Sequence, residues 1–221
     1  MKIAYQSEQE QLESLQKWWK ENGRTVIFGG LLGVAGIIGW SSWQAYTIRQ
    51  AEKTSFRYEQ VMTLAGNNAL DETIRQGESL IDEYPDSGYG ALTSLIVAKA
   101  ALDQNDTEKA KDRLRWIIDE GESPAVQSVA RLRLARLLAS EEKWQDATAL
   151  LDGDAGEFLG LYEEVRGDIL FAQGKIAEAR AAFGRSLANG NHLTDGRFRD
   201  RIKMKLEDLE SAPESEGAPD I

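Results

Sequence analysis

Residues 160–193, GLYEEVRGDILFAQGKIAEARAAFGRSLANGNHL, contain two short amphipathic runs with Gly174 between them. Apolar residues recur at helical spacing in both runs, and glycine commonly ends a helix in a left-handed conformation. Gly167 and Ala179 are small enough to let two antiparallel helices approach closely, and Phe183 can fill the space between neighbouring helix pairs. The segment is therefore predicted to form a helical hairpin.

The same pattern recurs in the preceding sequence, beginning with a unit 32 residues earlier. The matching small or apolar positions are Ala135, Ala147 and Leu151 in residues 128–159, and Ala98, Ala110 and Leu114 in residues 91–123. Residues 55–86 are interpreted as a degenerate first unit, and residues 196–209 as an amphipathic capping helix. Such spacing is typical of the tetratricopeptide repeat (TPR), a helix–turn–helix unit of about 34 residues. We therefore expect an all-α, TPR-like solenoid over residues 49–210.

A segment of a different kind precedes the repeats, because residues 25–48 carry no charge. A helix needs about 20 mostly apolar residues to cross a bilayer. Trp18, Trp19, Trp40, Trp43 and Tyr46 flank the segment, as aromatic residues do at membrane interfaces. No suitable pair of small residues follows for cleavage of a signal peptide. The prediction is a single uncleaved transmembrane helix in contact with the lipid bilayer.

The flanks of this span do not settle its orientation, because three basic residues lie close to it on each side. Gly29 and Gly33 form a GxxxG pattern that can pack against a partner helix, although glycine is also simply common in membrane helices.

Residues 1–24 are predicted to form an amphipathic arm. Residues 49–65 continue the helical pattern, and we expect only a short break between the span and the first soluble helix. The tail, residues 211–221, lacks an apolar pattern and is predicted to be disordered.

Composition argues against several classes of function. The chain has 26 Lys and Arg residues against 37 Asp and Glu residues, a net charge of −11, which disfavours nucleic-acid binding. It has no cysteine, and its one histidine, His192, lies in a predicted exposed loop. Thiol chemistry, multi-histidine metal sites and phosphate-binding loops are therefore not expected. We predict no enzymatic activity, no metal and no cofactor. A catalytic alternative would need an unrecognised carboxylate pair such as Glu164 and Asp168.

The remaining candidate site is the groove that the first helices of TPR hairpins line. Its predicted lining residues are Leu95, Lys99, Leu132, Arg136, Glu164 and Asp168. They have mixed charge and lack the run of Lys and Asn residues that clamps an acidic C-terminal peptide in chaperone-binding TPR proteins. Basic residues lie on helix 128–140, including Arg131 and Arg133, and along residues 197–205. They suggest either ordinary solvated helix faces with ion pairs to acidic neighbours, or contacts with an acidic partner or lipid headgroups.

The order of these features resembles one known family. A charged helical arm and a Gly-rich span closed by GWSSW are followed by YGALTSL, LRLARLL and VRGDILFAQGKIAEARAAF. This arrangement resembles the YfgM family, the ancillary subunits of the bacterial SecYEG translocon. The resemblance implies an inner-membrane protein with a cytoplasmic N-terminus and a periplasmic TPR domain. It also implies partnership with SecYEG and with the membrane-anchored periplasmic chaperone PpiD, in assisting secretory proteins that emerge from the translocon.

Two other hypotheses remain open at the level of sequence. One is an envelope scaffold that works without the translocon, and the other is a TPR adaptor that faces the cytoplasm. The orientation of the soluble domain distinguishes the cytoplasmic hypothesis from the others. Co-purification with the translocon distinguishes an ancillary subunit from a scaffold.

Overall fold

The computed structural model describes residues 5–190 and 196–211 and confirms the all-α prediction, since these residues contain no strand. The chain divides into two compact units, Met1–Lys53 and Thr54–Ile221. The helices are α1 (Tyr5–Gly66), α2 (Leu70–Glu83), α3 (Gly88–Asp103), α4 (Thr107–Glu120), α5 (Pro124–Ser140), α6 (Trp144–Leu151), the 3₁₀ helix η1 (Gly156–Phe158), α7 (Leu159–Ala172), α8 (Ile176–Asn189) and α9 (Gly196–Ser211). His192 and the tail residues 212–221 lie outside the described residues.

The predicted short break after the membrane span is wrong, because helix α1 continues through it. It runs without interruption from Tyr5 to Gly66, so the arm, the span and the first helix of the soluble unit share one helix. The physical reason is visible in the sequence, because residues 40–65 contain neither proline nor glycine to end the helix. Within this helix every residue from 24 to 49 is exposed, including Phe28, Leu32 and Ile37. An uncharged apolar stretch without a protein cover is suited to lipid, and this helix is apolar and long enough to cross a membrane.

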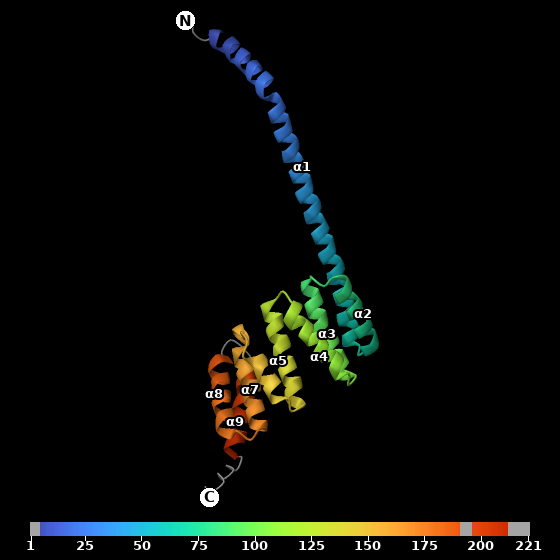
Figure 1. Cartoon of the computed structure of the whole chain (residues 1–221), viewed down its shortest axis with the longest axis vertical. Coiled ribbons are helices and arrows are strands. Elements are labelled where there is room, and N and C mark those ends of the chain that lie inside the picture. The colour runs from blue at the N-terminus through green and yellow to red at the C-terminus, as the bar shows by residue number, and fades with distance from the viewer. Residues whose placement is uncertain (1–4, 191–195, 212–221) are drawn as a thin grey trace. The chain divides into compact units, whose positions relative to one another are not determined.

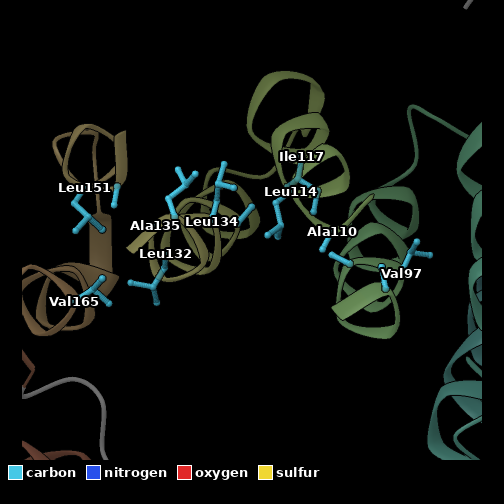
Figure 2. Close-up of a cluster of buried hydrophobic side chains, with 14 of the residues drawn as sticks. Val97, Ala110, Leu114, Ile117, Leu132, Leu134, Ala135, Leu151 and Val165 are labelled. Atoms are coloured by element: carbon cyan, nitrogen blue, oxygen red, sulfur yellow. The ribbon is translucent and has the colours of Figure 1, made fainter. Parts of the chain in front are cut away.

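The second unit is a row of antiparallel helix pairs that follow one another in chain order from α2 to α8 (Figure 1). Buried apolar side chains form a band along this row. Figure 2 shows the band extending from Val97 on α3, through Leu114 on α4 and Leu134 on α5, to Leu151 on α6 and Val165 on α7. Such a core joins neighbouring pairs, as it does in a solenoid. A smaller cluster joins α8 to α9 through Phe183, Phe198 and Ile202, among others.

The four hairpin turns share one backbone conformation. Each contains a residue with positive φ, namely Asn68 (57°), Asn105 (63°), Glu142 (59°) and Gly174 (75°). The N–H of the next residue donates to a carbonyl five positions back, as in the bond from Lys175 N to Leu170 O of 2.9 Å. This is the Schellman motif, which satisfies the free carbonyls at a helix end. The left-handed conformation predicted for Gly174 is confirmed. The same motif ends the first helix of all four hairpins.

Glu142 is the turn residue least suited to its conformation, because a side chain with a Cβ atom is strained at positive φ. Replacing it with glycine is expected to raise the free energy of unfolding by about 0.5–1 kcal/mol. Urea denaturation of the full chain in detergent micelles measures the change. As a matched control, Glu122→Gly in the α4–α5 loop, where φ is not positive, is expected to give no gain. Equal effects of the two substitutions would contradict the explanation.

Candidate functional site

One side of α3 and α5 carries two adjoining hollows. The α1–α3 hollow has a volume of about 370 Å³ and the α3–α5 hollow one of about 410 Å³. The first is lined by Tyr58, Ala65, Asn68, Leu70, Leu92, Leu95, Ile96, Lys99, Ala100, Asp103 and Arg133. The second is lined by Ala98, Lys99, Leu102, Leu114, Arg133, Arg136, Leu137 and Ser140. Lys99 and Arg133 line both, so the two hollows form a continuous surface across α1, α3 and α5.

Three of the predicted lining residues lie on this surface. Leu95 and Lys99 lie in the α1–α3 hollow, and Lys99 and Arg136 in the α3–α5 hollow. Lys99 also pairs with Asp103 one turn away, with 2.6 Å between Nζ and Oδ2, and both side chains are largely exposed. The residues come together because α3 and α5 pack against each other as successive first helices of hairpins.

Leu132 is placed differently, since it belongs to the core and is 4% exposed. Helix α5 packs against α3, α4, α6 and α7, which leaves little of its circumference open. The regular spacing of positions 132 and 136 suggested one shared face. The neighbouring helices cover the first position and leave the second at the surface.

Glu164 and Asp168 are held by α9. The Arg201 guanidinium donates to both carboxylate oxygens of Glu164, at 2.8 and 2.9 Å, and Lys205 Nζ lies 2.9 Å from the same carboxylate. Lys205 also donates to Asp168 at 2.6 and 2.8 Å. Arg136 Nη2 lies 3.8 Å from Glu164, so the network links α5, α7 and α9. Both carboxylates predicted for the groove already have cationic partners within the chain.

The electrostatics of Glu164 follow from this setting. Its side chain is 3% exposed, and burial alone would raise the pKa of the carboxyl group. The bonds from Arg201 and Lys205 outweigh burial and hold the pKa below its ordinary value. The pKa of Asp168 is raised, chiefly by burial, with a further contribution from the negative charge of Glu164. Glu164 therefore stays ionised at neutral pH and acts as an anchor for α9.

Another hollow, of about 590 Å³, lies between α6 and the α7–α8 hairpin. Its two arginines already have carboxylate partners, with Arg166 3.1 Å from Asp152 and Arg185 2.8 Å from Glu163. Both guanidinium groups of this hollow are therefore already paired with carboxylates of the chain.

The sequence analysis singled out the basic residues of α5 and α9 but did not predict the partners of Arg201 and Lys205. Arg201 and Lys205 are four residues apart, as are Glu164 and Asp168, so each pair occupies one face of its helix. That matched spacing was the available signal for the α7–α9 ion pairs. The position of Arg133 in both hollows was not visible in the sequence, because it depends on how α3 and α5 pack.

Gly29 and Gly33 lie on the exposed part of α1. A Cβ atom built on either glycine would meet no atom within 4 Å among the described residues. The backbone of α1 is therefore open to contact at both glycines. The part of the chain that the structure describes also contains no cluster of three or more Asp, Glu, His or Cys side chains that could hold a metal ion.

Comparison with known proteins supports this description. A family model described as a tetratricopeptide repeat-like domain matches residues 16–211. An Escherichia coli (strain K12) protein named "Ancillary SecYEG translocon subunit" is 30% identical over 180 residues, which are 81% of this chain and 86% of the relative. Relatives of the same name from Haemophilus influenzae and Neisseria gonorrhoeae are 28% and 26% identical, over 94% and 93% of this chain and 100% and 99% of their own lengths. No solved structure matches the chain significantly.

Proposed function

Because the chain belongs to the family of ancillary SecYEG translocon subunits, with its TPR-like domain, we propose that it is a membrane-anchored adaptor of the SecYEG translocon. In this role it has no chemistry of its own. It binds a PpiD-like membrane-anchored chaperone and assists secretory proteins as they emerge. Its N-terminus is cytoplasmic and its helical unit periplasmic. The observation that carries the proposal is the near full-length similarity to relatives of that name.

Three features of the chain support this assignment physically. The uncovered apolar stretch of α1 provides a single anchor, which together with the similarity fits a single-pass inner-membrane protein. The GxxxG pattern of Gly29 and Gly33 provides a surface on which a partner helix can approach the backbone closely. The stacked hairpins provide a long surface for proteins rather than an enclosed site for a small substrate.

Co-purification from membranes in mild detergent tests the partnership. The full chain with a tag after Ile221 is expected to retain SecYEG and a PpiD-like chaperone. A variant in which a foreign transmembrane helix replaces residues 25–48 is expected to retain less SecYEG. Recovery of the protein alone, or with unrelated envelope proteins, would favour the translocon-independent scaffold instead.

Orientation can be measured by labelling, because the chain has no cysteine of its own. We expect the Glu178→Cys variant to react with a membrane-impermeant maleimide in intact spheroplasts, since Glu178 is exposed on α8. The Gln16→Cys variant, exposed on α1, is expected to react only after the membrane is permeabilised. The reverse pattern would place the helical unit in the cytoplasm and contradict the proposal.

A further inference from the structure

The α3–α5 hollow combines an apolar floor with free positive charge. Ala98 and Leu114, 2% and 1% exposed, form the floor, and the partly exposed Leu102 lies at its edge. Arg133 and Arg136 line the same hollow from α5. A ligand that fills it can therefore bury an apolar side chain and present an anion to a guanidinium group.

Arg133 differs from the arginines that bridge helices elsewhere in the second unit. Arg166, Arg185 and Arg201 each pair with a carboxylate on another element. Arg133 Nη1 donates a long hydrogen bond, of 3.5 Å, to the backbone carbonyl of Leu95. Among the described residues no carboxylate lies within ion-pair distance of Arg133. Partial burial, and then the like charge of Arg136, lower the pKa of the Arg133 guanidinium. The Arg133 side chain is exposed, so a carboxylate from outside the chain can reach it and form a charge-assisted hydrogen bond.

The spacing of the ligand's groups follows from peptide geometry. In an extended chain, side chains at positions i and i+2 point to the same face. A peptide lying along α3 and α5 can therefore place an apolar side chain on the floor and a carboxylate at Arg133 when one residue separates them. The chain as a whole has a net charge of −11 and repels anions, so an acidic group is favoured only where basic side chains such as Arg133 and Arg136 lie together.

We propose that the α3–α5 hollow binds an extended segment of a partner protein in which a carboxylate lies two residues from a bulky aliphatic side chain. The inference deepens the proposed function, since it names the kind of segment that an emerging secretory protein would present. Arg133 provides charge recognition, and Leu102, Ala98 and Leu114 provide the apolar contact.

Fluorescence anisotropy tests this with the full chain in detergent micelles and a labelled nine-residue peptide centred on Leu-Ser-Asp. We expect saturable binding that weakens about tenfold when the peptide's Asp is replaced by Asn, and comparably when its Leu is replaced by Ser. The Arg133→Gln variant is expected to lose about tenfold for the Asp peptide and less than twofold for the Asn peptide. Arg180→Gln, an exposed arginine on α8, is the matched control and is expected to leave binding unchanged.

Three results would overturn the proposal. The first is equal affinity for the Asp and Asn peptides, and the second is equal loss in the Arg133→Gln and Arg180→Gln variants. The third is a gain of tenfold or more in a variant that ends at Ser211, which would assign the hollow to the chain's own acidic residues 212–221. The peptide assay requires no translocon, and Arg133→Gln is expected to leave co-purification of SecYEG intact. Failure of this inference is therefore distinguishable from failure of the proposed function.

Discussion

The Phe183→Ala variant is expected to lose about 3–5 kcal/mol of unfolding free energy, the cost typical of removing a buried phenylalanine ring. Phe183 is 2% exposed, and its ring lies against Gly167 on the facing helix α7. It also belongs to the small cluster that joins α8 to α9. Removing the ring leaves a cavity at the point where the last hairpin meets the capping helix. Urea denaturation of the full chain in detergent micelles measures the loss.

A double-mutant cycle with Gly167 tests whether the ring and the glycine act as a pair. A Cβ atom at position 167 would lie 2.5 Å from Phe183 Cε1, so Gly167→Ala alone is expected to destabilise the protein by about 1–3 kcal/mol. In the Phe183→Ala variant the ring is gone, so the methyl group added by Gly167→Ala fits without a clash. The substitution is then expected to stabilise by up to about 1 kcal/mol, because alanine favours a helix more than glycine does. Additive losses would show that the two positions are independent.

This pair illustrates how far the sequence could predict the fold. Gly167, Ala179 and Phe183 could be assigned to the contact between two helices from their spacing, because small residues set how closely helices pack. The left-handed turn at Gly174 followed from glycine chemistry. The corresponding turns at Asn105 and Glu142 were not predicted, since glutamate is poorly suited to positive φ and the fold imposes the conformation there.

The candidate surface was less predictable than the fold. Lys99 and Arg136 could be placed on it from helical register alone, and the structure brings them into one hollow. Glu164 satisfied the same register, yet α9 covers it, because a contact between residues 37 positions apart depends on how the capping helix docks. Register predicts which residues share a face. It does not predict which later element occupies that face.

Replacement of Glu164 by glutamine is expected to reduce the free energy of unfolding by about 2–3 kcal/mol and to loosen α9. The substitution keeps the shape of the side chain but leaves Arg201 without its carboxylate partner and Lys205 with Asp168 alone. Both cations are partly exposed, so water recovers some of the loss. Asp103→Asn provides the control, since it breaks the exposed pair with Lys99, and it is expected to cost no more than about 0.5 kcal/mol. Similar losses in the two variants would contradict a special role for the buried carboxylate.

Acid should remove the difference between the wild-type protein and the Glu164→Gln variant. The folded state lowers the pKa of Glu164, so the ionised carboxylate stabilises the fold above the ordinary carboxyl pKa, and this contribution is lost as the pH falls through the lowered value. The raised pKa of Asp168 has the opposite sign, but Asp168 is present in both proteins and its effect largely cancels in the difference. The stability gap is therefore expected to be full above a pH of about 5 and to shrink on further acidification. A gap that stayed constant or widened in acid would mean that residue 164 stabilises the docking of α9 through packing and not through its charge.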